Sequence, residues 1–341
     1  MSKYITIGCV GDLILDEPGP MEPYFEDCKT DISNIDVMIG HVETPHTKRA
    51  QPSSIKIQAP PSDPDHLDIM KDLGFKVATT AGNHSYDCGP FGVVDTLAKL
   101  HELGIQTCGT GANIFEAKKP AIVEADGVKI GVIDYNAVGP AWGWATSQKP
   151  GTNYVDILSF SRAEDMVGAF GKLYTFVEPD AKKKMIEEVK ELKAQCDIAV
   201  VIYHKGSGGK GPNLQMYEFE MTRSAIDAGA DIVFAHHHHQ LKAVEMYNGK
   251  PIFHGLGNFV CVTYAMTPGV NESPEMVAYM KEREKQGRGK AVYDPPYYPW
   301  TEETLETMIA QVKVDKTGVK EVGFIPYKID KTCDEEEINP T

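Results

Sequence analysis

Residues 231–239 read Asp-Ile-Val-Phe-Ala-His-His-His-His, and the rest of the sequence can be organised around this stretch. Its first five residues are typical of a buried strand, which leads directly into four consecutive histidines. In an extended backbone alternate side chains point to the same side, so His237 and His239 are expected to aim at one point. His236 and His238 then aim away from it. Because a neutral imidazole is the commonest protein ligand for a transition metal, the stretch predicts a metal-binding strand end. A polar loop with incidental histidines is the alternative.

The composition limits the classes of protein that this chain can belong to. It has 341 residues, of which 42% are hydrophobic, enough to bury a large core. The formal net charge of −15 argues against nucleic acid or an anionic membrane as a general partner. No basic and then apolar leader precedes the first predicted strand, and no apolar run is long enough to span a bilayer, so we expect a cytoplasmic protein without a membrane segment. The seven scattered cysteines, with no CxxC pair, fit reduced thiols.

Polar side chains also follow the other predicted core strands. The apolar run 4–10 ends at an aspartate, 35–40 leads into a histidine and a glutamate, 74–80 leads into a loop rich in ligands, and 197–203 ends in a histidine. Open α/β sheets bind ligands at the carboxyl ends of their strands. Mixed carboxylate, amide and imidazole groups suit one or two divalent metals such as Mn, Fe, Zn or Co. The residues at these strand ends are Asp12, His41, Glu43, Asn83, His84, His204, His237 and His239.

The remaining segments predict an α/β protein with one main domain. Residues 1–265 are expected to form that domain, and 266–330 a C-terminal extension whose terminal hairpin packs on the core. Residues 331–341 are expected to be a flexible acidic tail. Within the main domain, 138–178 contains irregular sequence with tryptophans, and it is expected either to cover a site as a lid or rim or to pack over the edge of the core. Further helices are predicted at 63–73, 92–103, 179–195 and 214–228, and hairpins at 121–133 and 243–255.

Six short motifs occur in unbroken order between residues 4 and 262. In this order they resemble the calcineurin-like metallophosphoesterase superfamily, and within it the bacterial capsule-synthesis or poly-γ-glutamate-synthesis branch, the CapA family. Each motif is weak alone, whereas the ordered set is specific. The motifs are Gly11-Asp12, His41-Val42-Glu43-Thr44-Pro45, Gly82-Asn83-His84-x-x-Asp87-x-Gly89, His204-Lys205-Gly206, Ala235-His236-His237-His238-His239 and Gly257-Asn258-Phe259.

The resemblance implies a four-layer α/β/β/α sandwich of the metallo-dependent phosphatase type, with metals at the strand ends. It implies that His84 protonates a leaving group or holds a substrate oxyanion, and that Asp87 orients His84. The cofactor would be one or two divalent metal ions, with Mn, Fe and Zn as candidates. The implied metal ligands are Asp12, Glu43, Asn83, His204, His237 and His239.

Three departures from the family pattern bear on the metal site. Ile14 stands where the wider superfamily has a histidine, so one metal position is short of a ligand. His41 stands in place of an asparagine and either fills that coordination or forms a hydrogen bond in the core. Ala235 and His238 replace a glycine and a proline, and His236 and His238 are expected behind the ligands or at the surface.

Three functions remain open at this point. The first is a metal-dependent hydrolase that uses activated water on a phosphoester or on an amide such as a γ-glutamyl bond, linked to poly-γ-glutamate or capsule metabolism. The second is an accessory protein that binds such a polymer without cleaving it. The third is a metal-dependent Cα epimerase with His84 or His41 as the base. In each case the partner is a small-molecule or peptide-like anion, and the sequence leaves the oligomeric state open.

Overall fold

The computed structural model describes residues 4–49, 61–163, 171–207, 213–264, 274–285, 300 and 302–329. The predicted acidic tail, 331–341, and much of the predicted extension between 265 and 301 lie outside the described residues. Within the described ranges, no helix has the length and apolarity needed to cross a membrane.

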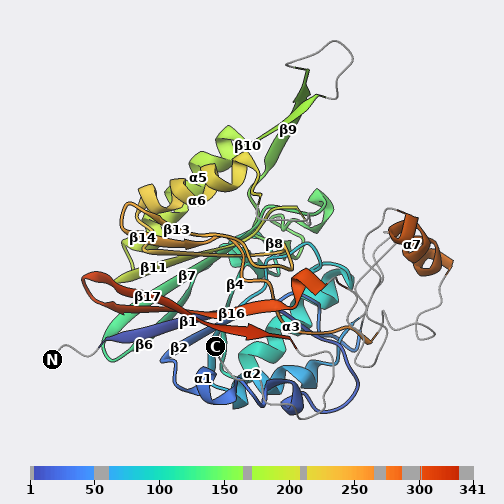
Figure 1. Cartoon of the computed structure of the whole chain (residues 1–341), viewed down its shortest axis with the longest axis horizontal. Coiled ribbons are helices and arrows are strands. Elements are labelled where there is room, and N and C mark those ends of the chain that lie inside the picture. The colour runs from blue at the N-terminus through green and yellow to red at the C-terminus, as the bar shows by residue number, and fades with distance from the viewer. Residues whose placement is uncertain are drawn as a thin grey trace.

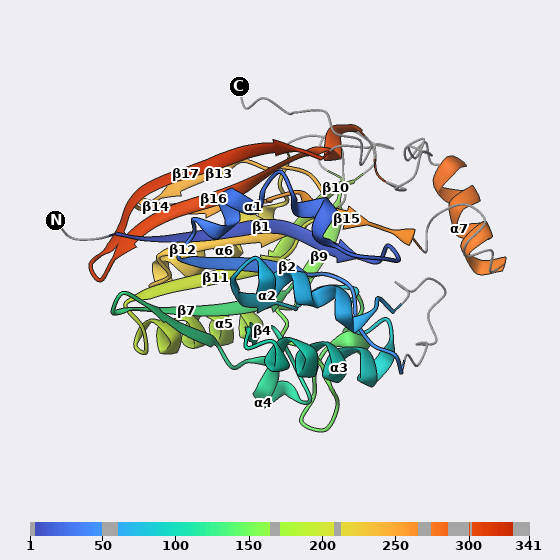
Figure 2. The ribbon, with the colours of Figure 1, turned by 90° about the horizontal axis from the view of Figure 1, so that it is seen from below.

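The first sheet carries the N-terminal strand at its centre. Its strands follow the order β17-β16-β1-β2-β3-β4, and β15 also pairs with β1. β1 to β4 are parallel, β15 runs parallel to β1, and β16 pairs with β1 in the antiparallel sense. Figure 2 shows the long β16–β17 hairpin along one edge, beside β1. The strands are β1 Ile5–Leu15, β2 Val37–Val42, β3 Phe75–Thr79, β4 Gln106–Cys108, β15 Asn258–Val262, β16 Glu306–Asp315 and β17 Gly318–Lys328.

The second sheet contains the strand that leads into the four histidines. Its order is β13-β14-β12-β11-β7-β6, with parallel pairing from β14 through β7. The two hairpins predicted at 121–133 and 243–255 are its edges, the pairs β6–β7 and β13–β14. The strands are β6 Ala121–Ala125, β7 Val128–Asn136, β11 Ile198–His204, β12 Ile232–His236, β13 Val244–Tyr247 and β14 Lys250–Phe253.

The two sheets face one another, and helices cover their outer faces (Figure 1). One core cluster lies between the sheets, one beneath α1, α2 and α3, and one beneath α5 and α6. The prediction of a four-layer α/β/β/α sandwich is therefore confirmed. The helices are α1 Lys29–Ser33, α2 Asp68–Asp72, α3 Gly89–Glu102, α4 Ile114–Ala117, α5 Pro179–Lys193, α6 Met216–Ala228 and α7 Pro274–Lys285.

The composition of β11 follows from its place between two core layers. Ile198, Val200 and Ile202 face the cluster between the sheets, whereas Ala199 and Val201 face the helices. A strand buried on both faces reads as a continuous apolar run rather than an alternating one. The run stops at a polar residue only where the strand reaches the end of the sheet, and that is where the site begins.

One hairpin within the predicted 138–178 segment projects from the body of the protein (Figure 1). β9 and β10 form a separate two-stranded antiparallel ribbon that the sequence analysis did not predict. The remaining short elements are β5 Thr110–Gly111, β8 Gly151–Thr152, β9 Ile157–Arg162 and β10 Lys172–Val177, with 3-10 turns at Glu22–Phe25, Pro64–Leu67, Ala141–Gly143 and Glu302–Thr304.

Candidate metal centre

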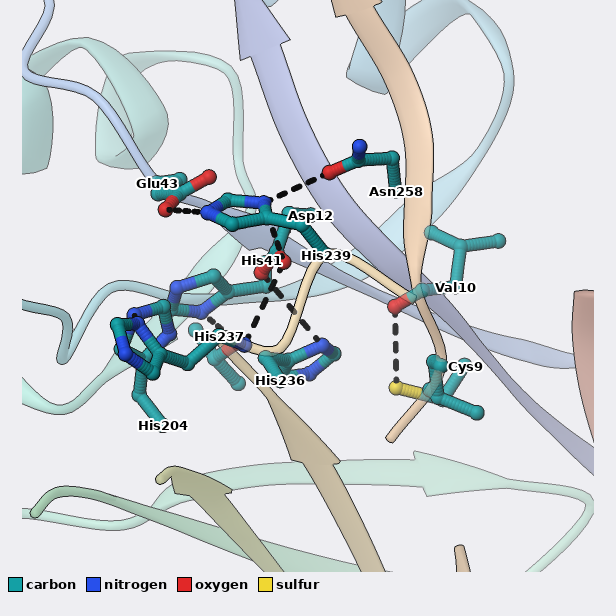
Figure 3. Close-up of polar contacts among 12 residues, drawn as sticks. Cys9, Val10, Asp12, His41, Glu43, His204, His236, His237, His239 and Asn258 are labelled. Carbon is teal, nitrogen blue, oxygen red and sulfur yellow. Dashed lines mark hydrogen bonds and ion pairs between the residues drawn. The ribbon is translucent and has the colours of Figure 1, made fainter. Parts of the chain in front are cut away.

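The ends of strands from both sheets meet at one place (Figure 3). In the first sheet, β1 and β2 bring Asp12 into register with His41. In the second sheet, β11 and β12 bring His204 into register with His236. All four side chains are buried, with at most 1% of their surface exposed. Residues far apart in the sequence thus converge because the parallel strands of both sheets end on the same side.

Asp12 lies within β1 and not at its end, which corrects the prediction that this strand stops at residue 10. The strand continues to Leu15, and its pairing register shifts beside Asp12 against both β2 and β15. Such irregularities locally re-aim a side chain. At Gly11 a Cβ atom would lie 2.0 Å from the carbonyl oxygen of Gly257, so only glycine fits this close approach of β1 to the start of β15.

The four histidines do not form one extended strand, which corrects the alternation argument. β12 ends at His236, and the backbone then turns, with φ of 90° at His237 and 55° at His239. Positive φ is unusual for residues other than glycine and breaks the strand alternation. His237 and His239 still lie close together, with ring centroids 6.2 Å apart, and His238 points elsewhere, towards Glu218.

His236 is placed differently from the prediction that it aims away from the site. Its ring stacks on that of His41, with centroids 4.8 Å apart, and its Nδ1 atom lies 3.9 Å from Oδ1 of Asp12. The buried side chain of His236 therefore lines the site. The turn after β12, rather than strand alternation, determines which rings face the centre.

One group of candidate ligands is built around two carboxylates. His239 lies between them, with Nδ1 3.4 Å from Oδ2 of Asp12 and Nε2 3.4 Å from Oε1 of Glu43. One ligand atom from each of the three residues lies within 4.8 Å of the other two. Asn258 accepts a hydrogen bond of 2.8 Å from the ring of His239 through Oδ1 when Nδ1 carries the proton.

A second group consists of an amide and two imidazoles. The Oδ1 atom of Asn83 lies 2.7 Å from Nε2 of His204 and 3.1 Å from Nδ1 of His237. The two ring nitrogens are 3.1 Å apart. These three atoms thus lie within 3.1 Å of one another, and in the tautomers that leave both ring nitrogens unprotonated they could ligate a single cation.

His41 is placed beside both groups. Its Nδ1 atom forms a 3.0 Å hydrogen bond with Oγ1 of Thr79, and its ring stacks on that of His204 at 4.8 Å. A ring nitrogen of His41 lies within 4.8 Å of ligand atoms of Asp12 and His204. Asp12 therefore belongs to two candidate ligand groups, one with Glu43 and His239 and one with His41 and His204. A carboxylate shared by two cations is expected to have such a position.

The pattern of unpartnered atoms fits divalent cations. Among the described residues, several fully buried polar atoms of this site have no hydrogen-bond partner. A buried polar atom without a partner is costly, and a cation held by Asp12 and Glu43 would satisfy their carboxylate oxygens. Carboxylate, amide oxygen and imidazole are also the donor types that Mn, Fe and Zn accept. The atoms are Oδ1 of Asp12, both carboxylate oxygens of Glu43, Nε2 of His41, Nδ1 of His204 and both ring nitrogens of His236.

The electrostatics of the site are consistent with this fit. Burial raises the pKa of Asp12 well above its usual range, and the charge of Glu43 raises it further. Burial likewise raises the pKa of Glu43 to about 7. Burial lowers the pKa of His204 and of His237 well below the ordinary imidazole value. A bound cation would favour ionised carboxylates and neutral imidazoles, the forms that ligate metals.

His84 and Asp87 form a pair at the accessible side of the site. Nδ1 of His84 lies 2.7 Å from Oδ2 of Asp87, and the side chain of His84 is 36% exposed, whereas that of Asp87 is 7% exposed. Burial lowers the pKa of His84, but the hydrogen bond to Asp87 and the charges of Asp87, Glu43 and Asp12 outweigh it and raise the pKa to about 9. The pair combines an oriented imidazole with contact to solvent.

Comparison with known families matches residues 6–263 to the family described as bacterial capsule synthesis protein PGA_cap. The chain belongs to this family. The resemblance inferred from the ordered motifs is therefore confirmed.

Two relatives illustrate the likeness. The PGA biosynthesis protein CapA of Bacillus subtilis (strain 168) is 30% identical over 232 residues, which cover 66% of this chain and 53% of that protein. The capsule biosynthesis protein CapA of Bacillus anthracis is 27% identical over 234 residues, which cover 67% of this chain and 51% of that protein. The chain spans about half the length of these relatives.

Solved structures with a related arrangement include two phosphatase-like proteins. A phosphatase from Mycoplasma pneumoniae aligns with a TM-score of 0.49 at 14% identity, over 97% of this chain and 96% of that one. The calcineurin-like phosphoesterase YfkN of Bacillus subtilis aligns with a TM-score of 0.44 at 12% identity, over 96% and 91% of the two chains.

At Ile14, where the superfamily pattern has a histidine, the structure has an apolar cluster. Ile14 packs with Cys261 and Leu305, and Trp300 lies against the same cluster. The Trp300 ring also contacts His239, with centroids 4.9 Å apart. Apolar side chains therefore close this side of the site, and His41 and His236 supply imidazoles on another side.

Two residues near the predicted ligands had no predicted role: Asn258, which contacts His239, and Glu218, which contacts His238. His236, which was expected behind the ligands or at the surface, lies beside Asp12. The Gly-Asn-Phe motif was a signal for Asn258. For Glu218 the sequence offers a helix-capping pattern with Gln215 but no indication of a partner near the metal site.

Proposed function

We propose that this chain is a metal-dependent hydrolase that acts on a phosphoester or on an amide such as a γ-glutamyl bond. One observation carries the proposal. Asp12 belongs to two groups of buried ligand atoms, and many of those atoms have no partner among the described residues. An isolated structural ion would need one group, whereas hydrolytic centres commonly share a carboxylate between two ions.

In this proposal Asp12, Glu43 and His239 would hold one cation. Asn83, His204 and His237 would hold the other, and His204 also forms a group of ligand atoms with Asp12 and His41. His41 is a further candidate ligand. Bound there, divalent ions of the Mn, Fe or Zn type supply Lewis acidity and a nucleophilic water to hydrolysis.

The chain itself supplies the proton for the leaving group. His84 is fixed by its 2.7 Å contact with Asp87, and its side chain is 36% exposed, so a substrate can reach it. The hydrogen bond to Asp87 and its charge raise the pKa of His84, which favours the protonated imidazole that can donate to a departing oxygen or nitrogen. Asp87 keeps the ring in the orientation that this transfer needs.

Membership of the capsule synthesis family supports an anionic, peptide-like substrate. The relatives are named as biosynthesis proteins of PGA and of capsule. Cations and a protonated His84 would attract carboxylate or phosphate groups into a site on a chain whose net charge is −15.

The test combines metal analysis with hydrolysis. We expect elemental analysis of the wild type to find about two first-row metals per chain, and His237→Ala to lose about half or more of them. His101→Ala, a control at an exposed histidine of α3, is expected to keep them all. Hydrolysis of p-nitrophenyl phosphate and of a γ-glutamyl anilide is then measured for wild type and His84→Ala. A folded, metal-free wild type without either activity would contradict the proposal.

A second candidate is binding of a γ-glutamyl polymer without cleavage, and the biosynthetic names of the relatives support it. Equilibrium binding of poly-γ-glutamate distinguishes the two. Binding that survives removal of metals by chelator, with no shortening of the polymer, favours the binding protein.

A further inference from the structure

A buried carboxylate on helix α6 lies directly behind the candidate metal centre. Glu218 is 1% exposed, and Oε2 accepts hydrogen bonds from Nε2 of His238 at 2.9 Å and from Nζ of Lys205 at 2.7 Å. Oε1 accepts the backbone N–H of Gln215 at 2.8 Å, within the capping box that begins α6. One side chain thus joins the start of a helix to two other segments.

The two joined segments are those that carry the imidazoles of the site. Lys205 directly follows His204 at the end of β11, and His238 lies between His237 and His239 in the turn after β12. Lys205 is fully buried, and its ammonium group also donates to the carbonyl oxygen of His254 at 3.2 Å. The ion pair between Lys205 and Glu218 therefore fixes the carboxylate that His238 contacts.

The turn after β12 needs such an anchor. His237 and His239 both have positive φ, a backbone conformation that non-glycine residues hold only when the surrounding structure determines it. Their rings point to the centre, where His237 contacts Asn83 and His239 contacts Asn258. His238 provides the contact on the opposite side, into the helix layer.

The space around His238 is restricted as well. At Gly206, where φ is +104°, a Cβ atom would lie 2.0 Å from Nε2 of His238, so a larger residue there would displace the ring. The glycine of the His-x-Gly motif is therefore required for the contact between His238 and Glu218.

We infer that Glu218 and His238 are positioning residues for the metal centre: their hydrogen bond holds the turn that aims His237 and His239, and Lys205 holds Glu218 in place. This inference rests on the proposed metal site. It adds Glu218 of helix α6, which would act on the site through His238 rather than by direct contact with a metal or substrate.

The test uses the full chain and measures zinc affinity by competition with a chromophoric chelator. His238→Leu removes the donor but leaves Glu218 paired with Lys205, so the metal-free protein is expected to stay folded. We expect its zinc affinity to fall by about 10- to 100-fold, the usual effect of losing a group that orients a ligand. His238→Gln places an amide N–H near the position of Nε2 and is expected to restore affinity to within about threefold of wild type.

Two further variants separate positioning from general stability. His254→Leu removes another fully buried histidine, which lies close to Lys205. The ring of His254 contacts Glu245 and not Glu218. We expect it to lower the thermal midpoint but to leave zinc affinity within about threefold. Gly206→Ala displaces His238 by a different route and is expected to weaken zinc binding as His238→Leu does. The ligand-field spectrum of the cobalt(II) protein reports whether the geometry changes in the two weakened variants.

The outcomes distinguish the inference from the function on which it rests. A wild type that binds no zinc contradicts the proposed metal centre. A wild type that binds zinc, with unchanged affinity and cobalt(II) spectrum in His238→Leu and Gly206→Ala, overturns the positioning role alone. If His238→Leu does not fold, the comparison of His238→Gln and Gly206→Ala with wild type decides in the same way.

Discussion

The Nε2 atom of His204 lies 2.7 Å from the Oδ1 atom of Asn83, although 121 positions separate the two residues. His204 ends a strand of the second sheet, and Asn83 follows β3 of the first. The contact therefore spans the junction between the two sheets. A site assembled in this way depends on how the sheets pack, so changes at the interlayer contacts are expected to affect metal binding as well as stability.

The first prediction concerns this contact. Asn83→Ala removes the oxygen that faces both His204 and His237, so we expect bound metal to fall from about two ions per chain to about one. Elemental analysis after dialysis measures the loss. Asn34→Ala, at an exposed position, is the matched control. Equal metal content in wild type and Asn83→Ala would remove Asn83 from the ligand set.

The second prediction separates proton donation from metal binding. Asp87→Asn keeps the size of the side chain but removes the charge that orients His84 across 2.7 Å. We expect kcat to fall by about 10- to 100-fold, with metal content unchanged. Steady-state kinetics and elemental analysis measure the two quantities, and Asp72→Asn at an exposed position is the control. Loss of metal in Asp87→Asn would instead place Asp87 among the groups that hold the ions.

The third prediction tests why a glycine precedes Asp12. A Cβ atom at position 11 would lie 2.0 Å from the oxygen of Gly257 and 3.0 Å from the oxygen of Leu256, both backbone atoms that cannot rotate away. We expect Gly11→Ala to lower the free energy of unfolding by roughly 1–3 kcal/mol and to weaken metal binding, because β1 must shift beside Asp12.

The control for this variant is Gly323→Ala in β17, where a Cβ atom would meet nothing within 4 Å. Denaturant titration of both variants measures the difference. If Gly11→Ala is as stable as Gly323→Ala, the close approach of β1 to β15 does not constrain this position.

Several parts of the site could be predicted because apolar runs identify their strands. The residues of β11 read as a continuous apolar run up to His204, and the same logic located the residues after β2 and β3. Parallel strands in one sheet place their ends together, so proximity follows from the order of elements. The ordered motifs then identified the family, which no single motif could do.

Other features depend on tertiary contacts that leave no local signal. Four identical histidines give no indication that the backbone turns at His237, so alternation wrongly placed His236 away from the site. Glu218 fits a helix cap in the sequence, whereas its contact with His238 arises only when α6 packs on the second sheet. The ribbon formed by β9 and β10 was missed because irregular sequence precedes it.

The last prediction concerns pH and a histidine outside the metal site. His46 is fully buried, and its Nδ1 atom donates to the carbonyl oxygen of Asp63 at 2.9 Å. Burial lowers its pKa from 6.5 to about 4. Between pH 6.5 and pH 4, His46 is protonated in the unfolded chain but stays neutral in the folded protein. The stability from the neutral ring is therefore complete above pH 6.5 and is lost as pH falls towards 4.

We expect His46→Asn, whose amide can keep the hydrogen bond to Asp63, to be less stable than wild type at pH 7 and to approach it in acid. From pH 7 to pH 5 the difference in unfolding free energy is expected to shrink by roughly 2 kcal/mol. Denaturant titrations at pH 7, 6 and 5 measure it, with His101→Asn at an exposed site as the control. Parallel stability curves for wild type and His46→Asn would mean that His46 takes up a proton in the folded protein as readily as in the unfolded chain.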